Sequence, residues 1–394
     1  MLASTKLFLK KIKYPKIVIF LCEKILSIIY FMQKHKRKST IEKLPDLNTS
    51  RKILKNFKQE SHYTIKDESK LPDVECDLSI IVPCYNVELY VSHCIESIVR
   101  QSFEGKLEVI IVNDGSTDRT TEIIESFQLP KNYIKINQVN AGVAAARNAG
   151  IEISRGKYLL FVDGDDVLPL NSVQKLYERA EADHLDMVVG NVNRLENPKK
   201  KMFSANNQFG VRSFNQVSIC ISGMPGSLYN RKLWKDTRFP TGYAFEDTCI
   251  PYLIASKVKG FAKLDETTYL YRSRIDGSSK DLMNPNVVDT VYIISYLLNS
   301  AQNKDIDVKA LNEITIYQLS RYTYERLNKV NSIKLMRAAF VISREIYLSY
   351  FSINVDFPLT TIEKDVLRAF NTENFDLWRR ASQAWMLTDK LQNI

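Results

Sequence analysis

The segment KYLLFVDGDDVLPL, residues 157–170, decides how the rest of this chain is interpreted. Its apolar and aromatic run, residues 158–162, is followed at once by Asp163, Asp165 and Asp166. A short apolar run bounded by turn residues indicates a buried strand. Carboxylates one residue apart behind such a strand can present oxygens to one hard divalent cation. The segment therefore predicts a core strand with a candidate metal or phosphate site at its end.

The acidic turn could also be a calcium loop, or a turn whose carboxylates cap backbone N–H groups. An EF-hand loop needs oxygen ligands at regular spacing over a dozen residues, and DGDDVLPLNSV places apolar residues there. Gly164, between the first two aspartates, would leave room for a ligand to approach closely. A metal with open coordination positions is matched to phosphate oxygens and neutralises a departing diphosphate.

Strands and helices alternate before this segment. Apolar runs predict strands at 78–86, 107–113 and 133–139, and helical spacing of apolar or small residues predicts helices at 87–101, 119–127 and 142–154. Near-continuous apolar strands that alternate with helices are typical of a parallel α/β sheet. Ligands bind outside the carboxyl ends of such strands, so Asn86, Asp114 and the acidic turn should meet at one rim.

Two residues near that rim could have either a functional or a structural role. Asp114 could accept a hydrogen bond from a nucleobase N–H, or cap the following helix, a role for which Asp118 is better placed. Arg147, on the small-residue helix, could hold a phosphate or a carboxylate such as Asp163. A purely structural salt bridge accounts for Arg147 equally well.

The net charge of +10 belongs to the N-terminal arm. Residues 1–60 contain 15 Lys and Arg against 4 Asp and Glu, and the remaining residues contain 40 against 41. Nucleic-acid binding by the main domain therefore gains no support from the charge. The six cysteines show no paired spacing and the four histidines do not cluster with them, which argues against a disulfide framework and a zinc site.

Three segments surround the α/β pattern. Residues 1–40 form a basic amphipathic arm whose apolar stretch is interrupted by Glu23 and Lys24, and no small-residue cleavage site follows it. The arm suits the surface of an anionic membrane, and a solvated tail or a helix packed on the protein is the alternative. Residues 41–76 read as a linker with room for one helix. Residues 284–394 have helical periodicity and could pack on the sheet or form an oligomer or membrane contact.

Four sequence motifs match those of a known family in their order and spacing. They are SIIVPCYNVELYVSHCIESIVRQSF, EVIIVNDGSTDRT, NAGVAAARNAGI and GKYLLFVDGDDVL. Together they resemble the family 2 glycosyltransferases, which have the GT-A fold, a Rossmann-like mixed and mainly parallel sheet. The similarity covers residues 77–195, and FPTGYAFEDTCIPYLI extends it to about residue 280. The resemblance implies a GT-A domain at 77–283.

The resemblance also implies a donor pocket for a nucleotide sugar. Asp163 and Asp165 match the DxD pair of the family, with Asp165 as ligand of Mn²⁺ or Mg²⁺ that bridges the diphosphate. Asp166 would orient the loop or touch the donor sugar. The pocket would be completed by Pro83, Tyr85, Asn86, Asp114 on the uracil or ribose, Asn140, Arg147 and Gly164.

A further carboxylate is needed as a base for the acceptor hydroxyl. In similar enzymes the aspartate of an ED pair has this role in a single, inverting displacement. The motif YAFEDT offers Asp247 as the base and Glu246 as a contact to the acceptor. One base plus one metal suits a direct displacement without a covalent intermediate. The pair could instead cap the start of a helix.

Two departures from the family pattern limit what the resemblance implies. Arg274 stands where many relatives have a histidine metal ligand, with Arg272 two residues earlier. A guanidinium cannot ligate a metal but can neutralise a diphosphate, so the metal requirement is less secure than the aspartates suggest. In addition, GMPGSLYNRKLW differs from relatives that carry an aromatic residue and a lysine there, so no acceptor specificity is transferred.

The sequence therefore predicts a cytoplasmic glycosyltransferase, peripheral on the inner face of a bacterial membrane, that uses a nucleotide-diphospho sugar. Its expected acceptor is an envelope glycan or a lipid-linked saccharide. A non-catalytic scaffold of the same fold is the first alternative, and the intact carboxylates weigh against it. A nucleotidyltransferase is the second, and PCYNVELY lacks the glycine-rich basic loop that it would need.

Overall fold

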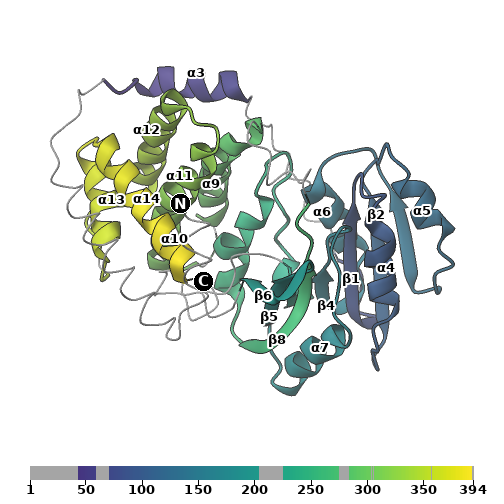
Figure 1. The fold of residues 1–394 in the computed structure, drawn as a ribbon. Coiled ribbons are helices and arrows are strands. Elements are labelled where there is room, and N and C mark those ends of the chain that lie inside the picture. Colours follow the sequence, from purple (N-terminus) through teal and green to yellow (C-terminus); the bar gives the residue numbers. More distant parts are fainter. Residues whose placement is uncertain are drawn as a thin grey trace, which may run out of the picture. The chain divides into compact units, whose positions relative to one another are not determined.

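The computed structural model describes residues 43–58, 71–203, 225–274, 284–302, 304, 306–355 and 357–392. The predicted membrane-surface segment, residues 1–40, lies outside the described residues. The described chain divides into an α/β unit, drawn from residues 71–274 and 300–306, and a helical unit, drawn from residues 43–58, 284–299 and 307–392 (Figure 1).

The first half of the α/β unit confirms the predicted alternation of strands and helices. Its strands are parallel, and its helices bury the apolar positions that recur three or four residues apart. The strands are β1 (Cys76–Cys84), β2 (Leu107–Asn113), β3 (Tyr133–Asn137) and β4 (Gly156–Phe161), and the helices are α4 (Val91–Val99), α5 (Thr120–Ser126) and α6 (Val143–Ile153).

The register of these strands brings their carboxyl ends level. Cys84 is paired with Asn113 across β1 and β2, and Ile81 is paired with Phe161 across β1 and β4. The segments that follow β1, β2 and β4 therefore leave the sheet at the same edge. This is the rim that the sequence predicts for Asn86, Asp114 and the acidic turn.

The second half of the unit makes the sheet mixed. Antiparallel β7 lies between β4 and β5, and β8 runs parallel to β5, in an eight-stranded sheet of order β3-β2-β1-β4-β7-β5-β6 with β8 paired to β5. The predicted mixed, mainly parallel sheet is thereby confirmed. The additional elements are α7 (Ser172–Ala182), β5 (Met187–Arg194), β6 (Asn197–Phe203), β7 (Ser227–Asn230) and β8 (Phe261–Tyr271), with short helical segments η1 (Arg231–Trp234), η2 (Glu246–Thr248), η3 (Ile250–Ile254) and η4 (Ala255–Lys257).

An aromatic cluster supports one face of β4. The ring of Phe161 lies 5.3 Å from Trp234 and 5.4 Å from Phe239, centroid to centroid, and all three side chains are fully buried. Aromatic pairs at such separations stabilise the folded state by more than the burial of their apolar surface alone would. The cluster fixes the segment that follows η1, and that segment leads directly to Glu246 and Asp247.

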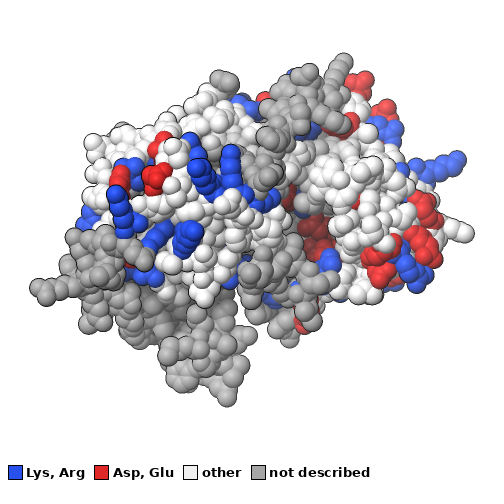
Figure 2. All heavy atoms as spheres, turned by 90° about the horizontal axis from the view of Figure 1, so that it is seen from above, with Lys and Arg blue, Asp and Glu red and all other residues white. Residues whose placement is uncertain are grey.

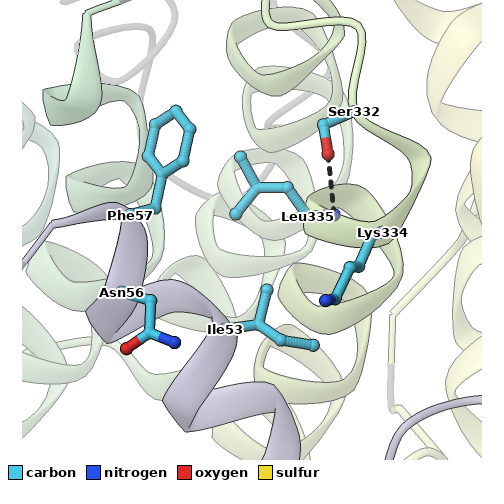
Figure 3. A pocket seen from close by; sticks show the side chains of 6 residues that line it. All are labelled: Ile53, Asn56, Phe57, Ser332, Lys334 and Leu335. Atoms are coloured by element: carbon cyan, nitrogen blue, oxygen red, sulfur yellow. Dashed lines mark hydrogen bonds between the residues drawn. The ribbon is translucent and has the colours of Figure 1, made fainter.

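The helical unit confirms the predicted C-terminal helical region. It also contains α3, which packs on α12, so the segment predicted as a linker contributes one helix to this unit. Ile53 and Phe57 of α3 face Leu335 across a hollow of about 230 Å³ (Figure 3). The helices are α3 (Leu47–Phe57), η5 (Pro285–Val288), α9 (Asp289–Ala301), α10 (Val308–Tyr317), η6 (Gln318–Tyr322), α11 (Thr323–Asn328), α12 (Ile333–Tyr350), α13 (Thr361–Asn371) and α14 (Phe375–Gln392).

Within the described part of the chain, no helix combines the length and the apolar character that crossing a bilayer requires.

Candidate active site

The acidic turn follows β4 and packs against the end of β1. The Asp166 N–H donates to the Asp163 carbonyl over 2.9 Å, and the Gly164 N–H donates to the Pro83 carbonyl over 3.2 Å. A Cβ on Gly164 would lie 2.8 Å from the Cys84 Sγ, closer than real Cβ contacts come. The glycine is therefore needed for contact with the strand. Its missing side chain faces β1, and the contact of Gly164 with a donor stays a prediction.

Arg147 joins the acidic turn to the ED pair. Its Nη2 lies 2.7 Å from the Asp163 Oδ1, its Nη1 bonds the Glu246 Oε1, and its guanidinium stacks 5.5 Å from the centroid of the Phe239 ring. The side chain is only 5% exposed. Charge-assisted hydrogen bonds of this kind are the strong ones in a protein. The structure shows the salt bridge from Arg147 to Asp163 that the sequence allowed, and Glu246 is the partner that the sequence did not reveal.

Asp166 is buried and serves the turn. Its Oδ2 accepts a hydrogen bond from the Tyr269 hydroxyl over 2.7 Å, and its Oδ1 accepts one from the Arg272 N–H over 2.7 Å. Burial, together with the charges of Asp163 and Asp165, raises the pKa of Asp166 to about 8. Because the residue is 1% exposed, it fits the predicted role of orienting the loop and does not fit a contact to sugar or phosphate.

Tyr269 is a site residue that the sequence did not indicate. Its hydroxyl donates to Asp166 and also accepts the Asp163 N–H over 3.0 Å, and the Val167–Leu270 bridge joins the same stretch of β8 to the turn. Tyr269 is fully buried. No local signal separates it from an ordinary core tyrosine, because only the pairing of β8 brings it to the turn.

Asp165 has a longer side-chain contact than the other two aspartates of the turn. Its Oδ2 lies 3.2 Å from the Nη1 of Arg274, and its side chain is 23% exposed. The Arg272 Nε donates to the Asp165 carbonyl over 2.7 Å. Burial raises the pKa of Asp165, the charge of Asp163 adds to the increase, and Arg274 opposes it.

Asp114 holds the loop after β3. Its Oδ1 accepts hydrogen bonds from the Gln138 side chain over 2.7 Å and from the Ala141 N–H over 2.9 Å, and its Oδ2 accepts one from the Gly142 N–H over 2.8 Å. The residue is 2% exposed, whereas Asn140 in the same loop is exposed. Asp114 thus shapes the loop where Asn140 is presented, and its role toward a nucleotide stays a prediction.

The residues after β1 lie at the same rim. The Asn86 Oδ1 accepts the Thr117 N–H over 2.8 Å, so Asn86 ties this loop to the loop after β2. Asn86 has a φ of 49°, a conformation that asparagine tolerates better than most residues. Pro83 is buried in β1, and Tyr85 presents an exposed ring, 46% accessible, at the rim. An exposed aromatic ring at a strand end suits stacking on a base.

Glu246 and Asp247 form the start of η2. Phe245 precedes them with a φ of 64°, and the Thr248 N–H donates to the Phe245 carbonyl over 3.0 Å. Burial raises the pKa of Glu246, Asp247 adds to the increase, and Arg147 opposes it. Asp247 is partly exposed. A carboxylate beside a paired one, in a turn fixed by a buried arginine, is well placed to act as a base.

The described residues do not by themselves build a metal centre. Among them, no three His, Cys, Asp or Glu side chains converge as a group that could hold a metal ion. Asp163 is committed to Arg147 and Asp166 to Tyr269. Asp165 contacts Arg274, and its role as a metal ligand stays a prediction.

Comparisons with known proteins point to one family. A family model described as "Glycosyl transferase family 2" matches residues 79–245. Glycosyltransferase GlyG of Streptococcus pneumoniae is 30% identical over 219 residues, 50% of this chain and 71% of that protein. The minor teichoic acid biosynthesis protein GgaA of Bacillus subtilis is 29% identical over 272 residues, 64% of this chain and 61% of that protein. This chain thus covers less than two thirds of GgaA.

One solved structure shows the same fold. Residues 1–349 of TarS from S. aureus, in complex with UDP-GlcNAc, superimpose with a TM-score of 0.64 at 20% identity, over 79% of this chain and 92% of that chain. At 20% identity, this similarity supports a shared fold and does not indicate a shared substrate. It confirms the predicted GT-A architecture.

Proposed function

The chain belongs to glycosyltransferase family 2, and from that premise we propose that it is an inverting enzyme with a UDP-sugar donor and a bacterial envelope glycan acceptor. The similarity to GgaA, a protein named for teichoic acid biosynthesis, supports an envelope polymer or a lipid-linked saccharide as acceptor. The UDP-GlcNAc complex of TarS makes a UDP-sugar the first donor to test.

The observation that carries the proposal is the bridge through Arg147. One buried guanidinium binds Asp163 of the acidic turn and Glu246 beside Asp247. The expected diphosphate end of a donor and the expected base are thereby held by a single side chain. A transferase needs this juxtaposition because its base must face the carbon that the leaving diphosphate departs from.

The proposed reaction is a single displacement. The acceptor oxygen attacks the anomeric carbon as its proton passes to the Asp247 carboxylate, and the bond from that carbon to the diphosphate oxygen breaks. One attack from the face opposite the leaving group inverts the configuration. Glu246 is held by Arg147, so it positions the turn that carries Asp247 and can present its other oxygen to the acceptor.

A divalent ion, Mn²⁺ or Mg²⁺, fits this site only in part. Asp165 would hold it, with the donor diphosphate supplying further oxygens, because the other two aspartates of the turn have protein partners. When bound, the ion would neutralise the leaving diphosphate. Since Arg274 contacts the same Asp165 carboxylate, ion and guanidinium would compete for it.

Nucleotide release from a panel of nucleotide sugars tests the proposal. The assay is run with a lipid-linked saccharide acceptor and with Mn²⁺, Mg²⁺ or EDTA. Asp247→Asn should lower kcat by on the order of 10³-fold, because a general base contributes about that much. Asp183→Asn, at an exposed surface ion pair of the same unit, is the matched control and should turn over as wild type. Equal rates for folded Asp247→Asn and wild type would refute the assignment of the base, and the absence of any donor binding would favour the scaffold alternative.

We also propose that the protein works at the cytoplasmic membrane surface. In addition to the basic arm, the exposed side of α3 carries Arg51, Lys52 and Lys55, and Lys and Arg gather on the face of the helical unit seen in Figure 2. Basic residues near an anionic bilayer each contribute about 1 kcal/mol. Replacing these three by Gln, and separately deleting residues 1–40, should each lower binding to phosphatidylglycerol vesicles. Unchanged vesicle binding by both variants would contradict the proposal.

A further inference from the structure

Three arginines contact the acidic turn, and they differ in what they can bind. Arg147 is 5% exposed and its terminal nitrogens are taken by Asp163 and Glu246. It holds two carboxylates of the protein, so it is a poor candidate for a phosphate ligand. Arg272 and Arg274 follow directly after β8 and contact Asp165 instead. Of the three arginines, Arg272 and Arg274 are therefore the candidates for binding a substrate anion.

Both of these guanidinium groups stack on one ring. The guanidinium carbon of Arg272 lies 5.0 Å from the centroid of Tyr90, and that of Arg274 lies 5.1 Å from the same centroid. Tyr90 directly precedes α4 and is therefore fixed by a core helix. Cation–π contact at this distance is attractive and orients the planar guanidinium group. Two cationic groups thus contact both Asp165 and one aromatic ring that is fixed at the start of a helix.

The contact between Arg274 and Asp165 is of the kind that a substrate can replace. At 3.2 Å it is longer than the usual 2.7 to 2.9 Å of a charged N–H···O pair, and the Arg147–Asp163 contact of the same turn is 2.7 Å. The two side chains remain 18% and 23% exposed.

We infer that Arg272 and Arg274, supported by Tyr90, form the binding site for the diphosphate of the donor. This inference rests on the proposed use of a nucleotide-diphospho sugar. Two guanidinium groups can each bind phosphate oxygens bidentately, and together they match the two negative charges of a diphosphate ester. When the donor enters, Arg274 exchanges the Asp165 carboxylate for a phosphate oxygen. Asp165 is then released for a divalent ion, and the donor is held even when no ion is present.

Binding of UDP, UMP and uridine, measured by calorimetry in EDTA, tests the inference without catalysis. Wild-type protein should bind UDP at least about tenfold more tightly than UMP, because a charged hydrogen bond to the second phosphate contributes on the order of a factor of ten or more. Arg274→Gln should remove most of this preference and leave uridine binding unchanged. Tyr90→Leu should reduce the preference in the same direction, because both guanidinium groups lose their support.

Arg100→Gln is the matched control, since Arg100 lies beyond the end of α4 in the same unit and its side chain is 70% exposed. It should bind all three ligands as wild type does. Equal binding of UDP and UMP in EDTA, with a preference that arises only when Mn²⁺ is added, would overturn the inference and leave the proposed transferase intact. An equal loss in Arg100→Gln would also overturn it, as a general charge effect. If neither UDP nor uridine binds with or without Mn²⁺, the proposed function fails together with the inference.

Discussion

Replacing Arg147 by methionine should destabilise the α/β unit in a pH-dependent way. Methionine keeps much of the apolar stem of arginine but removes the charge that neutralises Asp163 and Glu246. The two carboxylates then face a buried environment without a cation, and Glu246 is the more deeply buried, at 13% side-chain exposure. The pKa of Glu246 should rise further, because desolvation disfavours the charged form and the opposing contribution of Arg147 is lost.

Arg147→Met should lower the free energy of unfolding by about 3 kcal/mol at pH 8. Removing one partner of a buried ion pair costs about 3 to 5 kcal/mol, and the lower end applies because the Asp163 side chain is 30% exposed and can be hydrated. A carboxyl whose pKa is raised in the folded state binds its proton more readily when folded than when unfolded. The loss is therefore complete above the folded pKa and shrinks as the pH falls toward the unfolded value. Roughly 6 to 12 °C in Tm corresponds to 3 kcal/mol for a unit of this size.

Thermal unfolding of wild type and variant at pH 8 and at pH 5 provides the measurement. Arg119→Met removes the exposed surface pair with Glu122, whose side chains are 71% and 69% exposed, and should cost about 0.5 kcal/mol or less at either pH. If Arg147→Met lowers Tm no more than this control does, Arg147 does not stabilise the unit as a buried ion-pair partner. If the decrease in Tm is as large at pH 5 as at pH 8, the penalty does not come from unpaired carboxylates.

Three further substitutions have expected outcomes. Tyr269→Phe removes the hydroxyl hydrogen bonds to the acidic turn and should lower the free energy of unfolding by about 1 to 2 kcal/mol and slow turnover. An unchanged kcat would show that these hydrogen bonds do not position the turn. Gly164→Ala brings a methyl group within 2.8 Å of the Cys84 Sγ, so it should lower the free energy of unfolding measured in urea by about 1 to 3 kcal/mol and weaken UDP binding. Full wild-type stability would mean that the turn can shift freely. Thr360→Ala breaks the capping box of α13 and should cost about 1 kcal/mol while leaving kcat unchanged, so a loss of activity would contradict a purely structural role.

The sheet was predictable because its physical signal is local. Buried parallel strands require near-continuous apolar runs, and these runs give the positions of β1, β2, β3 and β4 within a few residues. The antiparallel strands of the second half carry no comparable signal. β7 has only four residues, and its place between β4 and β5 depends on pairing partners far away in the sequence.

The roles of single residues at the site were less predictable. The sequence places Asp163, Asp165 and Asp166 together but does not say which of them is buried. The structure separates them by their partners, because Asp166 bonds Tyr269, Asp163 bonds Arg147, and Asp165 is left with the longer contact to Arg274. The packing requirement at Gly164 was not predictable for a related reason, since the direction of its missing side chain depends on how the turn packs on β1.

The family, the parallel strands and the acidic rim follow from the order of apolar and charged residues along the chain. Which cation neutralises which carboxylate depends on how the chain folds. Arg147 and Glu246 are 99 positions apart, and Arg274 and Asp165 are 109 apart. Coulomb attraction within a few ångströms depends on distance in space, and separation along the chain does not encode that distance. The pairing of β8 beside β5 brings Tyr269, Arg272 and Arg274 to the turn, and with them the proposed diphosphate site.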